Sequence, residues 1–194
     1  MGYALKEDKK YTWQDYLNWP DSERWEIING EAYNMTPAPV IKHQNVTGNF
    51  FSRLKHKLDG KECRPFIAPT DVVLSEHDVV QPDVFVVCDK KKITAANIQG
   101  APDMVIEVLS PSTALKDKRE KRDLYERVGV KEYVIVDPTE LYVERFLLGA
   151  DGAYGKGEVF GPKEVMPLKS LADLEISLWE VFEVEGPGEK LEIS

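Results

Sequence analysis

Two acidic residues of this chain lie inside apolar segments, where a charged side chain is costly. Glu107 interrupts the segment Met104–Leu109, and Asp83 lies in a similar segment, Val79–Val87. Such segments are typical of strands that are buried on both faces of a sheet. An ionised carboxylate in such a strand costs free energy unless it is paired or holds a cation. Two acids on neighbouring buried strands therefore suggest a metal site.

The segment after Glu107 contains a candidate partner of opposite charge. Helical spacing over residues 113–128 gives one face that should meet the sheet. The apolar residues on that face are Leu124, Tyr125 and Val128. Asp117 and Lys121 fall on the same face, whereas the other charged residues of the segment fall mostly elsewhere. The spacing therefore selects Lys121 from many basic residues and predicts that it points toward the strand with Glu107.

An Asp, a Glu and a Lys that face inward together are suited to phosphodiester hydrolysis. Carboxylates hold Mg²⁺, which polarises a phosphate and lowers the pKa of a bound water molecule. A lysine can orient that water or stabilise the charge that develops on the phosphate. The alternative is a buried Glu107–Lys121 ion pair with a structural role only, and the spacing alone does not separate the two interpretations.

The elements that must position these residues can be predicted from periodicity and from turn residues. A hairpin is expected over residues 25–33, with a tight turn at Asn29-Gly30. Helices are expected over residues 13–19, 41–58, 113–128 and 178–182. Further strands are expected over residues 63–68, 72–74, 84–87, 104–109, 133–136 and 142–148, and a Gly-rich loop or hairpin over 149–161. This order predicts a mixed α/β fold.

The length of 194 residues fits a single domain, 1–194, with a core over 11–183 and an extended or disordered acidic tail over 184–194. No apolar stretch approaches the roughly 20 residues needed to cross a bilayer, and the first residues lack the apolar core of a signal peptide. We therefore expect a cytoplasmic protein without a membrane partner. Cys63 and Cys88 match no metal-binding spacing, so two reduced, buried thiols are expected.

The net charge of −9 argues mildly against a nucleic-acid partner, because phosphate binding needs a basic surface. The charge is unevenly distributed, however, with basic clusters at residues 90–92 and 116–122. Solvated surface is the commoner explanation of such clusters. Charge alone therefore leaves the partner undecided.

Several short motifs, taken in order, resemble the Uma-two family of restriction endonucleases, which belongs to the PD-(D/E)XK nuclease superfamily. The resemblance covers about residues 11–183. The matching segments are residues 24–31, Thr36–Pro39 with His43-Gln44, Pro82-Asp83, Glu107–Thr113, Asp117, Lys121, Tyr125, and Gly129–Pro138. Each motif is weakly specific alone, but their order and spacing together are quite specific.

The resemblance implies a restriction-endonuclease-like fold, a mixed β-sheet flanked by helices. It also implies a Mg²⁺ site, with Mn²⁺ as an alternative ion, and DNA as the substrate. Asp83 would be the first acid and Glu107 the second, and together they would bind the metal. The superfamily lysine follows its Glu by two residues, but that position is Leu109 here. The resemblance therefore implies a displaced lysine, and helical spacing independently selects Lys121.

Four other residues are candidates with alternatives left open. Glu26 matches a glutamate of the family and would add a catalytic carboxylate, or else it is a surface residue of its strand. His43 would contact phosphate, or else it is a capping or surface residue. Tyr125 is expected to be a core aromatic residue with its hydroxyl near the site. Asp117 would orient Lys121, as residues four apart on a helix can.

Two hypotheses follow. The first is a Mg²⁺-dependent DNA endonuclease or nickase, with the metal bridging Asp83 and Glu107 and with Lys121 near the attacked phosphate. A homodimer is expected, because a two-fold axis suits the cutting of both strands of a duplex. The alternative is a non-catalytic module that keeps the nuclease fold for a structural or partner-binding role.

Overall fold

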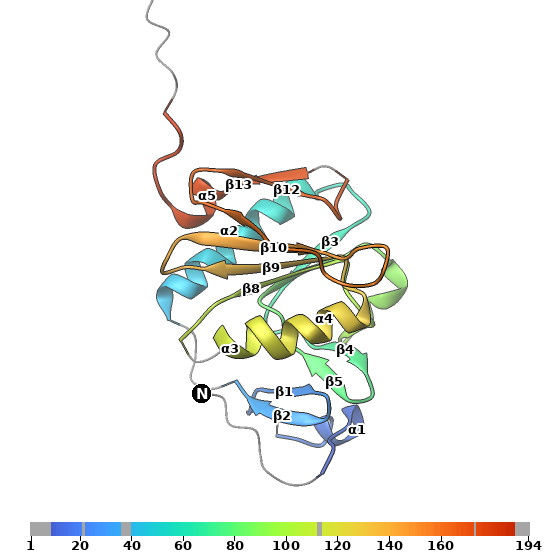
Figure 1. Ribbon diagram of the computed structural model, residues 1–194. Helices are drawn as coiled ribbons and strands as arrows, with labels where there is room; N and C mark the ends of the chain where they lie inside the picture. The colour runs from blue at the N-terminus through green and yellow to red at the C-terminus, as the bar shows by residue number, and fades with distance from the viewer. Residues whose placement is uncertain (1–8, 21, 36–39, 112–113, 173, 189–194) are drawn as a thin grey trace, which may run out of the picture.

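The computed structural model describes residues 9–20, 22–35, 40–111, 114–172 and 174–188. Within these residues a six-stranded sheet forms the centre of the molecule (Figure 1). Its strands, in spatial order, are β11 (Glu158–Phe160), β10 (Tyr142–Leu147), β9 (Glu132–Asp137), β8 (Met104–Val108), β6 (Val84–Val87) and β3 (Arg64–Ile67). β8 and β9 are parallel, and the other neighbours are antiparallel. The sheet is therefore mixed, as predicted.

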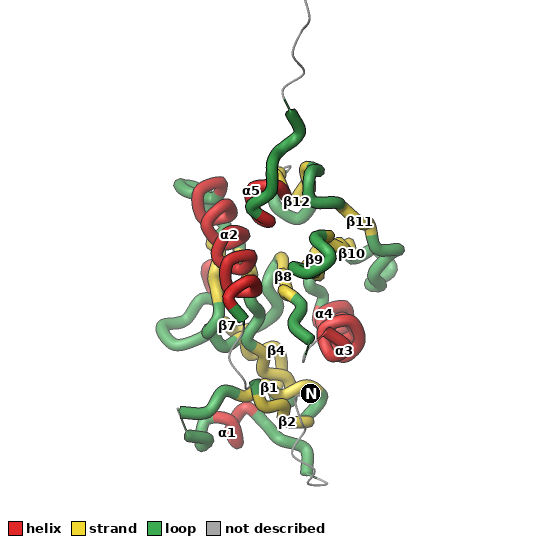
Figure 2. The backbone as a smooth tube through the Cα atoms, turned by 90° about the vertical axis from the view of Figure 1, so that its left-hand side faces the viewer, coloured by secondary structure: helices red, strands yellow, loops and turns green. Residues whose placement is uncertain are grey.

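β6 and β8, two neighbouring strands in the interior of this sheet, are buried along their whole length. One face packs against the long helix α2 (Ile41–Lys57), through alternate residues such as Val84 and Ile106. The opposite face, with Phe85 and Val105, packs against α4 (Arg122–Val128). Figure 2 shows α2 and α4 on opposite sides of β8. This double coverage explains the apolar runs in the sequence, and Glu107 faces the α4 side because it alternates with Ile106.

The helix that follows β8 is continuous but not uniform. It begins as α3 (Ala114–Lys116), passes through a π-helical stretch, Asp117–Lys121, and continues as α4. It ends at Gly129, which adopts the left-handed conformation with φ 83°. The predicted end at Val128 is confirmed, whereas the π-helical stretch was not predicted. Ser112 and Thr113, expected to begin this helix, lie outside the described residues.

A second sheet lies beside the first and, in the described residues, contains five strands. They are β2 (Glu31–Asn34), β1 (Trp25–Ile28), β5 (Asp78–Val80), β4 (Val72–Ser75) and β7 (Ile98–Gln99). The turn between β1 and β2 uses Asn29 (φ 52°) and Gly30 (φ 78°), which confirms the predicted hairpin. The apolar segment Val79–Val87 is divided between the sheets at Gln81-Pro82-Asp83, because proline cannot continue a central strand.

The remaining elements differ from expectation mainly at the ends. α1 (Trp13–Tyr16) is shorter than predicted, and Thr12 and Asp15 form a capping box at its start. α5 (Leu178–Phe182) lies where it was predicted. β12 (Val165–Leu168) and β13 (Leu174–Ser177) form an additional hairpin that was not predicted, and Lys90–Lys92 form a short 3₁₀ turn. Of the expected acidic tail, residues 184–188 contain no helix or strand, and residues 189–194 lie outside the described part.

The expectation of two reduced thiols is wrong, because Cys63 and Cys88 form a disulfide. β3 and β6 pair with Arg64 opposite Val87, so one further step outward places Cys63 opposite Cys88. The two cysteines are 25 residues apart in the sequence, and no local pattern indicates that they pair. None of the helices in the described part of the chain is long and apolar enough to span a bilayer.

Candidate active site

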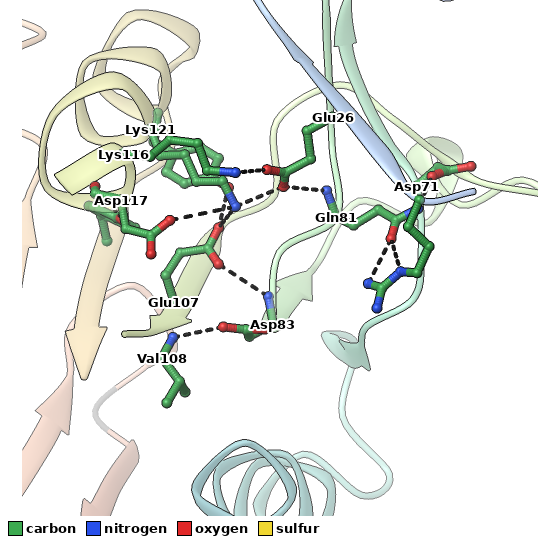
Figure 3. Close-up of polar contacts among 12 residues, drawn as sticks. Glu26, Asp71, Gln81, Asp83, Glu107, Val108, Lys116, Asp117 and Lys121 are labelled. Atoms are coloured by element: carbon green, nitrogen blue, oxygen red, sulfur yellow. Dashed lines mark hydrogen bonds and ion pairs between the residues drawn. The ribbon is translucent and has the colours of Figure 1, made fainter. Parts of the chain in front are cut away.

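The site lies where the two sheets meet, beneath the helix that contains the π-helical stretch. β6 and β8 pair with Val84 opposite Ile106, so Asp83, one residue before β6, lies opposite Glu107. The Asp83 backbone N–H donates to Glu107 Oε2 at 3.4 Å, and the Val108 N–H donates to Asp83 Oδ2 at 2.8 Å (Figure 3). The two acids therefore occupy adjacent positions at one end of β6 and β8, as predicted.

Lys121 points inward from the helix, as its spacing predicted. Its Nζ lies 2.8 Å from Glu107 Oε1, 2.7 Å from Glu26 Oε1 and 3.9 Å from Asp117 Oδ1. Burial alone would lower the pKa of Lys121, but the charges of these three carboxylates outweigh it and hold that pKa well above its usual value. Lys121 is therefore a buried cation at all ordinary pH values.

Glu26 reaches the site from β1, in the other sheet. Its side chain is fully buried, and its Oε1 accepts the Gln81 backbone N–H at 3.1 Å in addition to the Lys121 ammonium. Its Oε2 accepts from Lys116 Nζ at 2.6 Å. Burial would raise the pKa of Glu26, but Lys116 and Lys121 lower it to about 2. Glu26 thus belongs to the site rather than to the surface, and Lys116 is a member that sequence analysis missed.

The Glu107 carboxyl group has a raised pKa. Tyr125, whose hydroxyl was expected near the site, donates to Glu107 Oε1 at 2.7 Å. Burial raises the pKa of Glu107 to about 8; Lys121 opposes this shift, and the carboxylates of Asp83, Asp117 and Glu26 add to it. Because burial is the main cause of the shift, Glu107 keeps its proton up to about pH 8 when no cation is bound.

His43 approaches the site from α2, on the far side of the strands. Its ring is buried, with Nε2 3.2 Å from Asp83 Oδ2 and Nδ1 3.4 Å from Thr47 Oγ1. Burial would lower the pKa of His43, but its hydrogen bond to Asp83 and the charges of Asp83 and Glu107 raise it. His43 is therefore neither a cap nor a surface residue, and it anchors the Asp83 carboxylate.

Gln81 connects the site to a second polar group that the sequence did not indicate. Its backbone N–H binds Glu26, and its side-chain Oε1 accepts from Arg24 Nε at 3.1 Å and Nη2 at 2.9 Å. Its Nε2 donates to Asp71 Oδ1 at 2.9 Å and to the Tyr16 hydroxyl at 3.2 Å. This network holds the segment Gln81-Pro82-Asp83 between the sheets.

The charges and donor atoms of the site fit a divalent cation bound mainly by water and carboxylates. Among the described residues, the site brings together the carboxylates of Asp83, Glu107, Glu26 and Asp117 and the ammonium groups of Lys116 and Lys121. With all four carboxylates ionised, four negative charges face two positive charges, or three when His43 is protonated. A proton on Glu107, which its raised pKa favours when no cation is bound, removes one of the negative charges.

Among the described residues, no three or more His, Cys, Asp or Glu side chains are placed so that they could hold one metal ion together. This argues against a closed Zn²⁺ or Ca²⁺ site. Mg²⁺ instead keeps several water ligands and needs only one or two carboxylates. Asp83 and Glu107 are the candidate donors for such an ion.

Comparison with known proteins places this geometry in context. Residues 13–179 match the model of the family described as "Uma2: Putative restriction endonuclease". Two uncharacterised proteins of Synechocystis sp. are similar over 145 residues: slr1290 is 27% identical (72% of this chain, 75% of that protein), and sll1609 is 28% identical (72% and 81%).

A crystal structure from Anabaena variabilis, described as "a putative nuclease belonging to DUF820", has a TM-score of 0.72 to this chain. The two are 21% identical, and the match covers 89% of this chain and 97% of the other. At this identity the likeness establishes a shared fold, and it confirms the predicted restriction-endonuclease-like architecture.

Proposed function

This chain belongs to the Uma2 restriction endonuclease family, and from that premise we propose that it is a Mg²⁺-dependent DNA endonuclease or nickase that hydrolyses phosphodiester bonds. The observation that carries the proposal is the adjacent placement of two acids, Asp83 and Glu107, on neighbouring strands, with a buried lysine 2.8 Å from Glu107. A buried carboxyl group with a strongly shifted pKa and a specific charged partner is typical of functional sites.

In this proposal Asp83 and Glu107 hold the metal ion, and the Val108 carbonyl assists. Asp83 Oδ2 is held by the Val108 N–H and by His43, which fixes the orientation of the carboxylate. Glu107 Oε1 is held by Lys121 and Tyr125, so Oε2 is the oxygen turned toward Asp83. When bound, Mg²⁺ or Mn²⁺ would polarise the attacked phosphate and increase the acidity of a water molecule.

Lys121 takes the role of the lysine that the superfamily places two residues after its Glu. Here that strand position is Leu109, which is buried in the apolar cluster with Leu124 and Tyr125. The helix that packs on this cluster instead places Lys121 beside the Glu107 carboxylate, with Lys121 Nζ 2.8 Å from Glu107 Oε1. Its positive charge would stabilise the charge that develops on the phosphate.

One observation favours the alternative, a nuclease fold retained as a non-catalytic module. The Lys121 ammonium already lies within 2.8 Å of two carboxylates, so its charge is largely matched without a substrate. A buried ion-pair network of this kind also serves a purely structural role in other proteins. Activity measurements with matched variants separate the two functions.

The test compares nicking of supercoiled plasmid, with Mg²⁺ or Mn²⁺, by the wild type and by two variants. Glu107→Gln keeps the shape of the side chain but removes the charge that would hold the metal, so both Mn²⁺ affinity and cleavage should fall. Lys121→Ala should leave Mn²⁺ affinity, measured by calorimetry, nearly intact while slowing cleavage by on the order of 10²–10³.

Glu62→Gln is the matched control, because Glu62 is an exposed acid next to Cys63, at the opposite end of β6 from Asp83. It should cut like the wild type. Equal activity in every variant would indicate a contaminating nuclease, and no activity in any of them would favour the non-catalytic module. Light scattering with and without duplex tests the proposed homodimer, which would cut both strands, whereas a monomer would nick one.

A further inference from the structure

Lys116 is a second lysine at the site, one that regular α-helical spacing places away from it. We infer that Lys116 is a further catalytic residue, which exchanges its ion pair with Glu26 for a contact with the phosphate of bound DNA. The inference rests on the proposed nuclease function and assigns the substrate contact within it.

The π-helical stretch explains why two lysines of one helix meet at one carboxylate. Lys116 and Lys121 are five residues apart, a spacing that a regular α-helix turns to different faces but that one π-helical turn brings together. As a result, Lys116 contacts Glu26 Oε2 at 2.6 Å while Lys121 contacts Glu26 Oε1 at 2.7 Å (Figure 3). π-helical turns of this kind occur frequently at functional sites.

The two lysines differ in their access to a substrate. The Lys116 side chain is 14% exposed, whereas that of Lys121 is 3% exposed and that of Glu26 is fully buried. The Asp83 side chain, on the proposed metal ligand, is 19% exposed. Lys116 and Asp83 are therefore more accessible to a phosphate than the buried side chains of the site.

The ion pairs also differ in what is lost when each one opens. Lys121 would have to leave both Glu26 and Glu107 to reach a phosphate, and this would leave two buried carboxylates without their shared cation. If Lys116 leaves Glu26, that carboxylate keeps Lys121 and the Gln81 N–H. Lys116 also lies 5.4 Å from the centre of the Tyr33 ring, a contact that a partly exposed lysine exchanges at little cost. Lys116 can thus change its partner while the buried Glu26 carboxylate keeps a cation, Lys121, beside it.

The experiment measures binding of a fluorescent DNA duplex, with Ca²⁺ in place of Mg²⁺, over a series of salt concentrations. Lys116→Ala should weaken binding and lower the slope of log affinity against log salt by about 1, as expected for one lost phosphate contact. Lys116→Arg should retain the slope, since it keeps the charge. Plasmid cleavage should fall in Lys116→Ala, while Mn²⁺ affinity by calorimetry stays at the wild-type value.

Lys118→Ala is the matched control on the same helix, because Lys118 is exposed and donates to the Tyr142 hydroxyl at 3.2 Å. It should keep the wild-type slope and cleavage. A Lys116→Ala protein with the wild-type slope and cleavage, or a Lys118→Ala protein with an equal loss, would overturn the inference and leave the nuclease proposal intact. A wild type that neither binds duplex nor nicks plasmid would remove both.

Discussion

At the scale of single residues, the site is defined by how the two oxygens of Glu107 are used. Oε1 accepts from Lys121 and Tyr125, and Oε2 faces the Asp83 N–H at the longer distance of 3.4 Å. Glu26 is used differently, since both of its oxygens are bound by lysines. The two buried glutamates consequently have opposite pKa shifts, raised for Glu107 and lowered for Glu26. One is suited to exchange a proton for a metal ion, and the other is permanently charged.

The raised pKa of Glu107 predicts how stability depends on pH when no divalent ion is present. Between its ordinary value of 4.5 and about 8, folded Glu107 retains a proton that the unfolded chain has released. The free energy of unfolding should therefore fall as pH rises through this interval. Glu26 has its pKa lowered to about 2, so its contribution is lost only as pH falls below about 4.5.

Thermal denaturation of the wild type and of Glu107→Gln, from about pH 5 to about pH 9, measures this dependence. The Gln variant should show a smaller fall with rising pH, because it has no group that titrates at this position. Added Mg²⁺ should stabilise the wild type more at the higher pH, since the ion binds the ionised carboxylate. Parallel curves for the two proteins would contradict the assigned shift.

At the scale of elements, the helix over residues 114–128 has two tasks that a regular α-helix could not combine. Its apolar residues pack on the sheet through Leu124 and Tyr125, and its first turns deliver both Lys116 and Lys121 to Glu26. The π-helical stretch Asp117–Lys121 accommodates the five-residue spacing between those lysines. The helix geometry, rather than the choice of residue alone, therefore sets the composition of the site.

Deletion of Arg119, an exposed residue inside the π-helical stretch, should convert this region to a regular α-helix. Lys116 and Lys121, then four residues apart in a regular α-helix, would stay on one face, about 40° apart. Duplex binding and plasmid nicking should therefore both be retained, with helix content by circular dichroism unchanged. Arg119→Ala is the control, because it keeps the five-residue spacing and the π-helical stretch. A deletion protein that no longer nicks, beside an active control, would show that the site needs more of the π-helical stretch than the alignment of these two lysines.

At the scale of the whole molecule, the site is a junction between two sheets. Glu107 lies on the six-stranded sheet and Glu26 on the other, with Gln81-Pro82-Asp83 crossing between them. Lys121 joins the two sheets, because it binds both glutamates (Figure 3). The same charges that we propose for catalysis therefore also hold the two sheets together.

Glu26→Ala should consequently destabilise the fold by about 3–5 kcal/mol, the range measured when one partner of a buried ion pair is removed. Urea denaturation measures the change. Glu31→Ala on β2 is the control, since Glu31 is exposed and its truncation should change stability by about 0.5 kcal/mol or less. A loss for Glu26→Ala no larger than that of the control would mean that the network contributes little to joining the sheets.

The sequence by itself determined the features that depend on the direction in which a side chain points within its own helix, strand or turn. Alternation and apolar runs located β6 and β8 around the two acids, the Asn29-Gly30 pair located the hairpin, and helical spacing turned Lys121 inward. The family motifs indicated the fold, which the similar crystal structure from Anabaena variabilis confirms. These predictions hold because side-chain direction within an element follows from its period alone.

Tertiary structure alone decided which distant residues meet. The pairing of Cys63 with Cys88 depends on the register between β3 and β6, and the place of Glu26 depends on how the second sheet lies against the first. His43 reaches Asp83 because α2 covers the opposite face of the same strands, and Lys116 reaches Glu26 because the helix departs from its regular period. The period of a helix or strand determines the direction in which a side chain points from its own element. Which residue it contacts there depends on the order of the strands and on the path of the chain between the sheets.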